Sequence, residues 1–128
     1  MQFTIKTTKR EEIIDITSQV SEVVAENADE NSKVCLVYVP HTTCGILINE
    51  NYDSDVQADI LDFLKNSVPK SGWKHSEGNS DAHIKASLIG TSQLIPIENS
   101  VLGLGKWQGV ALCEFDGPRE RKVIVKII

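Results

Sequence analysis

The feature that most constrains the fold is a series of short apolar segments in the second half of the chain. Each segment is rich in aliphatic residues and is bounded by turns that contain glycine or asparagine. Segments of this length between turn residues are typical of β-strands. The predicted strands cover residues 92–97, 101–104, 110–115 and 122–128. Because short turns separate them, we expect a sheet in which most neighbouring strands run antiparallel.

The first half of the chain mixes strand and helix signals. Apolar segments again predict strands, over residues 3–5, 13–16, 33–39 and 45–49. A helix over residues 18–29 is expected because Val20, Val23 and Val24 stand at helical spacing. Thr17 or Ser18 offers a hydroxyl that can cap its start.

Two further helices are expected before the second half begins. One begins at Asp53 or Ser54, places four aliphatic residues on one face and ends before Pro69. The other is short, with Asp81 as its N-cap and Gly90 as its stop signal. The sequence therefore predicts one α+β domain over residues 1–128, with a mixed, mostly antiparallel β-sheet or sandwich and two to three helices.

Length and charge narrow the class of protein. A chain of 128 residues corresponds to one domain of ordinary size, and its net charge of −5 disfavours a protein that holds nucleic acid by its overall field. The longest apolar run, residues 34–39, is far shorter than the roughly 20 residues of a membrane-spanning helix. Residues 1–10 lack a signal-peptide core, so we expect a cytoplasmic protein. Because of the net charge and the short apolar run, we expect neither nucleic-acid nor membrane partners. Three cysteines without paired spacing are expected to be reduced and buried.

All three histidines stand at or near the ends of predicted elements, among small or polar residues. They are His41, His75 and His83. Imidazole is a common zinc ligand and also the side chain that titrates near neutral pH, so convergence of these rings would create a metal site or an acid/base site. Their spacing matches no zinc-finger motif. Taken singly, each histidine could equally be a solvated loop residue.

The densest polar stretch, residues 75–83, is the primary site candidate. Gly78 and Asn79 allow a tight turn just before a predicted helix N-terminus, where free N–H groups favour an anion such as phosphate. The alternative is that Asp81 only caps this helix and Glu77 only complements its dipole.

A second candidate lies at the end of the predicted strand 110–115. Its residues are apolar on both faces, yet the segment ends in Glu114 and Asp116, with Arg119 and Arg121 just beyond. Unpaired buried carboxylates are costly. These residues therefore indicate either a structural ion pair or an anchor for a charged substrate.

Two tempting patterns are interpreted as structural. The glycines around Leu104 lack the spacing of a dinucleotide-binding loop and precede a strand. Cys44 follows His41 by three residues, but a buried small hydrophobic residue is the better interpretation than an activated thiol.

Five motifs in chain order resemble the signatures of the YjbQ-like family, which is described as a family of secondary thiamine-phosphate synthases. They are His41-Thr42-Thr43-Cys44-Gly45, Ile48-Asn49-Glu50-Asn51, the segment 75–83, Gly105-Lys106-Trp107-Gln108-Gly109 and Glu114-Phe115-Asp116-Gly117-Pro118-Arg119. The resemblance covers nearly the whole chain. Cys44 and Ser80 depart from the family pattern, in which alanine is expected at these positions. Both replacements are small side chains.

This resemblance implies a homotrimer whose polar motifs gather in a cleft near the subunit boundary. It also implies synthesis of thiamine phosphate from hydroxymethylpyrimidine diphosphate and thiazole phosphate, with release of pyrophosphate. The departing pyrophosphate needs positive charge, for which Arg119, Lys85, the helix start or a divalent metal, Zn or Mg, is available.

The resulting site prediction has three parts. The expected catalytic residues are His41, His75, His83, Glu77 and Asp81. The expected substrate-binding residues are Thr42, Thr43, Asn49, Gly78, Asn79 and Arg119. The expected metal ligands are His41, His75, His83 and Glu114. Two other functions stay open, a metal-dependent hydrolase or lyase on another small phosphorylated molecule and a non-catalytic small-molecule-binding trimer.

Overall fold

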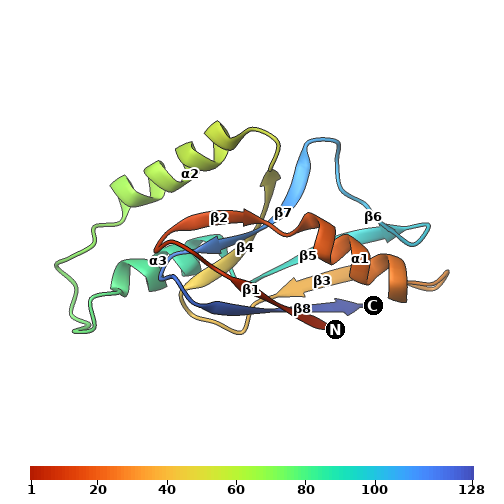
Figure 1. Ribbon diagram of the computed structural model, residues 1–128, viewed down its shortest axis with the longest axis horizontal. Helices are drawn as coiled ribbons and strands as arrows, with labels where there is room; N and C mark the ends of the chain where they lie inside the picture. Colours follow the sequence, from red (N-terminus) through yellow and green to blue (C-terminus); the bar gives the residue numbers. More distant parts are fainter.

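The computed structural model describes residues 1–128, which form two antiparallel sheets and three helices (Figure 1). The five-stranded sheet has the order β1 (Gln2–Lys6), β8 (Glu120–Ile127), β3 (Val34–Tyr38), β5 (Ser92–Glu98), β6 (Val101–Leu102). The three-stranded sheet has the order β2 (Glu12–Asp15), β7 (Gln108–Glu114), β4 (Cys44–Glu50). Every strand pair is antiparallel.

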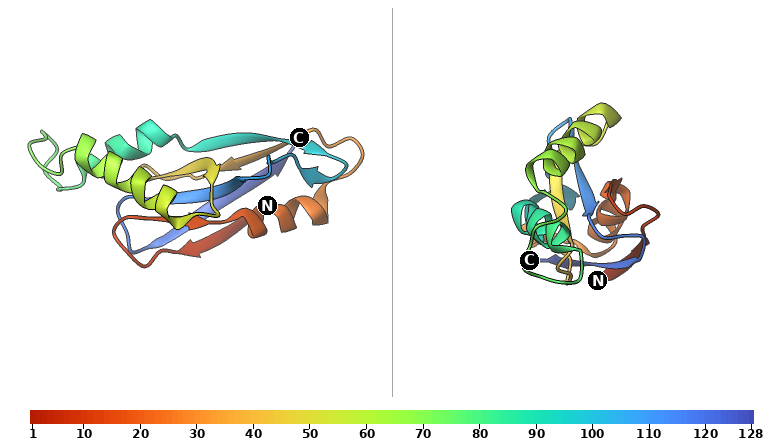
Figure 2. Two further views of the ribbon diagram at one scale, coloured as in Figure 1. Left: turned by 90° about the horizontal axis from the view of Figure 1, so that it is seen from above. Right: turned by 90° about the vertical axis from the view of Figure 1, so that its left-hand side faces the viewer.

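The three helices take different positions around the sheets. Helix α1 (Thr17–Asn27) contacts β7 of one sheet and β6 and β8 of the other, so it bridges them. Helix α3 (Ser80–Ile89) packs against β4. Helix α2 (Ser54–Ser67) lies outermost, and the loop from α2 to α3 extends to one end of the molecule (Figures 1 and 2). No helix is both long and apolar enough to cross a membrane.

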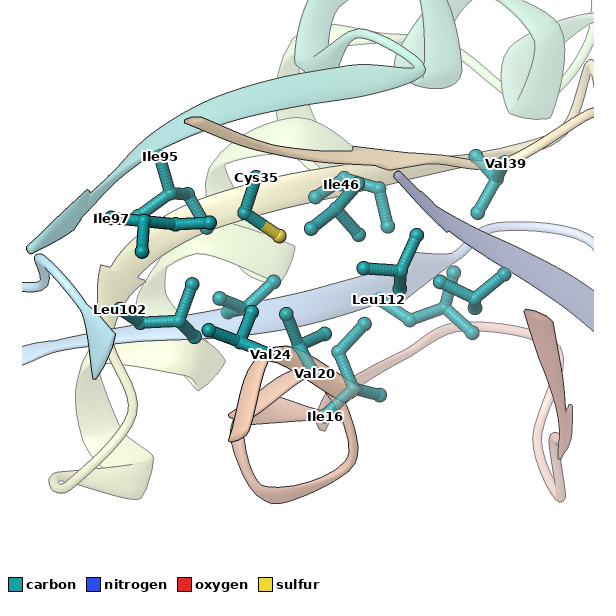
Figure 3. Close-up of a cluster of buried hydrophobic side chains, with 14 of the residues drawn as sticks. Ile16, Val20, Val24, Cys35, Val39, Ile46, Ile95, Ile97, Leu102 and Leu112 are labelled. Atoms are coloured by element: carbon teal, nitrogen blue, oxygen red, sulfur yellow. The ribbon is translucent and has the colours of Figure 1, made fainter. Parts of the chain in front are cut away.

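The main core lies between the two sheets and under α1. It contains 15 buried hydrophobic residues, among which Cys35 and Ile95 from one sheet approach Ile46 and Leu112 from the other (Figure 3). Val20 and its neighbours on α1 close this core, as their helical spacing predicts. Burial of this apolar surface is the main source of stability.

Strand β7 is buried on both faces because it separates two cores. Val110 and Leu112 belong to the main core, whereas Cys113 and Phe115 pack with Ala82 and neighbours from α2 and α3 in a second cluster of 5 residues. The predicted apolar character of both faces is thus confirmed.

The two sheets are joined where β4 approaches the start of β5. The Ile46 N–H donates to the Gly90 carbonyl at 3.0 Å, and the Gln93 amide donates to the Ile46 carbonyl at 3.2 Å. Gly45 permits this approach, since a Cβ there would lie 2.6 Å from the Gly90 oxygen. The seam fixes the start of β4 relative to the end of α3.

The predicted α+β class and antiparallel sheets are confirmed, and three details differ. The predicted strand 101–104 shortens to Val101–Leu102. Gly103 still donates its N–H to the Pro96 carbonyl, but Pro96 has no N–H with which to continue the pairing. Helix α1 is capped by neither Thr17 nor Ser18, since its N-cap is Ile16. Asp81 is not an N-cap either. Asn79 holds that position in α3, and Asp81 lies in the first turn, buried.

Candidate functional site

A polar pocket of about 440 Å³ opens at the end of the molecule where β3 ends and α3 begins. Its walls come from the segment after β3, the start of α3 and the β7–β8 connection. The lining residues are Pro40, His41, Thr42, Thr43, Glu77, Asn79, His83, Asp116, Arg119 and Arg121. We call this hollow the polar pocket.

The floor of the polar pocket is a buried ion pair between Arg121 and Glu114. The Arg121 Nε donates to Glu114 Oε2 at 2.8 Å, and its Nη2 donates to the Thr43 hydroxyl at 2.7 Å. The Thr7 hydroxyl donates to the same Glu114 oxygen at 2.9 Å. Burial opposes the charged form of Arg121, but the bonds to Glu114 outweigh it and raise its pKa. The Arg121 guanidinium therefore stays protonated beneath the pocket, with the Glu114 carboxylate as its partner.

A second arginine stands at the rim. The Arg119 Nε donates to the Asp116 carbonyl at 2.8 Å, and its Nη2 lies 3.0 Å from Asp116 Oδ2. Its side chain is half exposed, and Nη1 makes no hydrogen bond within the chain. Arg121 likewise makes its bonds through Nε and Nη2 alone. Each of the two guanidinium groups thus keeps one N–H₂ free for an anion.

Asn79 lines this side of the pocket and holds a buried acceptor without a partner. Its Nδ2 donates to Asp116 Oδ2 at 2.9 Å, which fixes the orientation of the amide because the reverse orientation would set oxygen against oxygen. Its Oδ1 is then buried without a hydrogen-bond partner. A buried polar atom of this kind is normally satisfied by water or ligand.

His41 is held as a neutral imidazole with a defined tautomer. Its Nε2 accepts the Lys122 backbone N–H at 2.9 Å, so Nδ1 carries the proton in the neutral ring. Burial, reinforced by the Arg121 charge, lowers the pKa of His41 below its ordinary value. At neutral pH this ring can therefore donate one hydrogen bond through Nδ1.

His83 connects the polar pocket to its surroundings. It lines the polar pocket together with His41, and its ring lies edge-to-face with His75 at 5.6 Å between centroids. His75 itself faces a neighbouring hollow, and its Nε2 lies 3.9 Å from Glu77 Oε2. The three histidines thus gather at one end of the molecule, two in the polar pocket and one beside it.

Asp81 and Lys85, which the sequence assigned to chemistry, lie outside the pocket. Both side chains are 1% exposed. Arg10 Nη2 lies 3.0 Å from Asp81 Oδ1, and Lys85 Nζ lies 2.9 Å from Glu11 Oε1. Burial alone would raise the pKa of Asp81, but Arg10 and then Lys85 lower it. These four charges anchor α3 to the start of β2, so the prediction of catalytic or phosphate-binding roles for Asp81 and Lys85 is corrected to a structural one.

Two predicted substrate contacts also lie elsewhere. Asn49 pairs with Gly109 near the end of β4 that is remote from Cys44 and the polar pocket, and it is exposed. Gly78 has a φ of 80°, which allows the predicted turn, but it does not line the pocket. The chain folds so that β4 separates Asn49 from the other predicted contacts.

The predicted ligands His41, His75, His83 and Glu114 do not form a metal site within this chain. No group of three histidine, cysteine, aspartate or glutamate side chains has a suitable arrangement. Glu114 is committed to Arg121, and the tautomer of His41 leaves no free lone pair on its ring. The donor set therefore does not fit a zinc ion, which needs three or four free ligands.

Comparison with known proteins assigns the family. The family model described as "UPF0047 protein YjbQ-like" matches residues 1–128. The chain belongs to this family. It is 50% identical over 128 residues to UPF0047 protein MJ1081 of Methanocaldococcus jannaschii, a match that covers 99% of this chain and 92% of that protein. It is 47% identical to UPF0047 protein YugU of Bacillus subtilis, with 97% of this chain and 95% of that protein covered.

Solved structures of YjbQ-like proteins share the fold. A crystal structure of a YjbQ/UPF0047 protein from Clostridium acetobutylicum superposes with a TM-score of 0.96 at 53% identity, over 100% of this chain and 99% of that one. A YjbQ-like protein of unknown function from Sulfolobus solfataricus gives a TM-score of 0.94 at 34% identity, with 99% and 94% of the two chains covered.

Two of the YjbQ-like motifs have a structural role in this chain. The Asn51 Nδ2 donates to Asp15 Oδ1 at 3.0 Å and to the Val110 carbonyl at 3.3 Å. Gly109 makes room for this amide, since a Cβ there would lie 2.0 Å from the Asn51 nitrogen. The motifs around Asn49 and Trp107 therefore stabilise the end of the β4–β7 strand pair that is remote from the polar pocket.

The sequence did not identify Arg121, Asp116 or Trp73 as site residues. Arg121 and Asp116 belonged to a cluster that indicated either a structural ion pair or an anchor for a charged substrate, and nothing in the sequence shows that both line a hollow. Trp73 is an exposed aromatic residue two positions before His75 in a glycine-containing loop. That position was the one available signal.

Proposed function

We propose that this YjbQ-like protein is an enzyme that acts on a small phosphorylated substrate bound in the polar pocket. The observation that carries the proposal is the pair of arginines, each with a free Nη1, one on the floor and one at the rim. Phosphate oxygens match such guanidinium groups well. The exposed Thr42 hydroxyl and the Nδ1–H of His41 add neutral donors to the same hollow.

The reaction we propose is the one that the family resemblance implies, formation of thiamine phosphate. The thiazole nitrogen attacks the methylene carbon of the pyrimidine diphosphate, the carbon–oxygen bond breaks, and its electron pair leaves with pyrophosphate. Negative charge then develops on the bridging oxygen. Arg119, Arg121 and the neutral His41 are the groups that would stabilise this charge.

A divalent cation, where the reaction uses one, fits better as magnesium that accompanies the diphosphate than as resident zinc. Magnesium takes one or two carboxylates together with substrate phosphates. Glu77 is the exposed carboxylate on the wall of the polar pocket. The bound cation would neutralise part of the diphosphate charge, while Glu77 orients it.

We further propose that the functional unit is a homotrimer. Large hydrophobic side chains stay exposed on the isolated chain, including Tyr52 at 86%, Phe63 at 69% and Trp107 at 56%. Exposed aromatic residues are typical of interfaces. Light scattering should give three times the chain mass of 14.1 kDa, and a monomeric mass would contradict this assembly.

The test of the activity is a direct assay with both phosphorylated halves and magnesium. Thiamine phosphate and pyrophosphate should appear in equal amounts, and Arg119→Ala should reduce the rate at least tenfold whereas the exposed Lys122→Ala should not. No product, under conditions in which an established thiamine-phosphate synthase is active, overturns the synthase proposal. Binding of pyrophosphate without turnover would then favour the non-catalytic binding protein.

The metal-dependent hydrolase or lyase is the second candidate, favoured by the contact between His75 and His83. It requires ligands from a second copy, because one chain offers no group of three. About one zinc per chain that disappears in a His83→Ala variant would support it. Metal-free protein that releases phosphate from no test compound would count against it.

A further inference from the structure

A second hollow of about 540 Å³ adjoins the polar pocket at the end of the molecule formed by the α2–α3 loop. Three aromatic or imidazole rings and one aliphatic side chain form most of its wall, from Trp73, His75, His83 and Ile84. Its volume lies in the range of small-molecule sites. We call it the aromatic pocket.

Trp73 lines this pocket with its one hydrogen-bond donor already engaged. Its indole Nε1 already donates to the Pro69 carbonyl at 2.6 Å within the loop. The side chain is nevertheless 42% exposed in the isolated chain, so part of the ring meets solvent. An indole with its polar atom satisfied and its ring accessible is suited to stacking on another flat ring.

His83 belongs to both hollows. It lines the polar pocket with the two arginines and lines the aromatic pocket with Trp73 and His75. The two sites are therefore continuous around one imidazole. A ligand with a flat ring in one hollow and a phosphate in the other would place the linking bond beside His83.

We propose that the aromatic pocket binds a planar aromatic ring of the substrate while the polar pocket binds its phosphate. This inference rests on the proposed function and names the class of substrate, an aromatic ring joined to phosphate through a short linker. Trp73 is then a specificity residue. Trp73 makes the site selective for aromatic over aliphatic phosphate esters, whereas the arginines contact the phosphate of both.

The test compares two phosphate esters of equal charge, phenyl phosphate and glycerol 3-phosphate, by calorimetry. Stacking on an aromatic side chain should make phenyl phosphate bind about tenfold more tightly. Trp73→Leu should abolish this difference and leave the affinity for glycerol 3-phosphate unchanged. Trp73→Phe should restore most of it, because a ring is retained.

A spectroscopic readout locates the ring independently of affinity. The chain has two tryptophans, so Trp107→Phe leaves Trp73 as the only indole. Phenyl phosphate should change Trp73 emission, whereas glycerol 3-phosphate and inorganic phosphate should not.

The outcomes separate the two proposals. Equal affinities for the two esters in the unaltered protein, or a difference that survives Trp73→Leu, overturn the aromatic subsite and leave the phosphate site intact. Failure of both esters and of pyrophosphate to bind overturns the proposed function together with this inference.

Discussion

The Arg121 Nε lies 2.8 Å from Glu114 Oε2, and both side chains are at most 2% exposed. A charge in this position is tolerated only while its partner is present, because desolvation of an unpaired ion is costly. Glu114→Ala should therefore lower the free energy of unfolding by about 3–5 kcal/mol in urea denaturation.

A matched double variant tests whether the pair serves function rather than stability. Glu114→Leu with Arg121→Met removes both charges and should recover much of the stability. It should still lose phosphate binding, since one of the two arginines is gone. Retention of phosphate affinity in this double variant would contradict a role for Arg121 in the polar pocket.

The buried carboxylate of Asp81 should matter for stability and not for ligand binding. Asp81→Ala leaves Glu11 as the one carboxylate shared by Lys85 and Arg10 and should cost about 1.5–3 kcal/mol of unfolding free energy. Since its pKa is lowered in the fold, the stability it adds is present above about pH 3.9 and is lost as the pH falls through the folded value. Phosphate affinity of the folded fraction should stay within about twofold. Loss of phosphate binding without loss of stability would restore the catalytic interpretation.

The lowered pKa of His41 predicts a sign for the pH dependence of stability. Between the folded value and about 6.5, the unfolded chain takes up a proton that the folded ring excludes, so this contribution is lost on acidification and regained as the pH rises. Proton NMR titration of the three histidines, assigned with His41→Gln, should give a midpoint for His41 below 6.5. Lys122→Ala keeps the backbone N–H and should leave that midpoint in place. A midpoint above 6.5 would contradict the partly buried, neutral ring.

Gly109 should be intolerant of a side chain. A methyl group at this position collides with the Asn51 amide, so Gly109→Ala should cost about 1–3 kcal/mol in thermal or urea unfolding. The same substitution in an Asn51→Ala background should cost less, because the colliding atoms are absent. An equal cost in both backgrounds would place the strain elsewhere.

The thiols should be unreactive in the folded protein. Burial raises the pKa of Cys35 to about 11 and, as the main cause, those of Cys44 and Cys113 to about 12. Thiolate is the reactive form, so titration with a chromogenic disulfide should proceed only after unfolding. Rapid reaction of Cys44 in native protein would revive the Cys–His alternative.

Periodicity made most of the fold predictable because it reports which side of each element meets the core. The strands β4 and β7 and the helix α2 follow directly from their apolar spacing. What the spacing of Asp81 could not show is its partner Arg10, which lies 71 positions earlier in the chain. An aspartate near the start of a helix is expected both for a helix cap and for a buried ion pair, so the sequence does not distinguish the two roles.

The sequence predicted a polar site at the ends of elements, but it could not show which residues would line one pocket. The histidines indicated a metal or acid/base site, and the turn at Gly78 and Asn79 indicated an anion site. The structure places Asn49 away from the polar pocket and Arg121 in its lining, because β4 carries Asn49 to its far end. Residues of neighbouring motifs can lie at opposite ends of one strand, as Cys44 and Asn49 do in β4. Trp73 could not be identified for the opposite reason. It is a loop residue without a motif, and only the fold shows that it lines the same hollow as His83 of α3.

The position of β8 inside its sheet has a consequence for biosynthesis. This strand follows all the others in the domain, yet it lies between β1 and β3 and supplies Arg121 to the pocket floor. A ribosome must therefore release almost the entire domain before the five-stranded sheet can close. Contacts of such long sequence separation form slowly, so the nascent chain leaves the exit tunnel with an incomplete sheet and depends on β8 to finish folding.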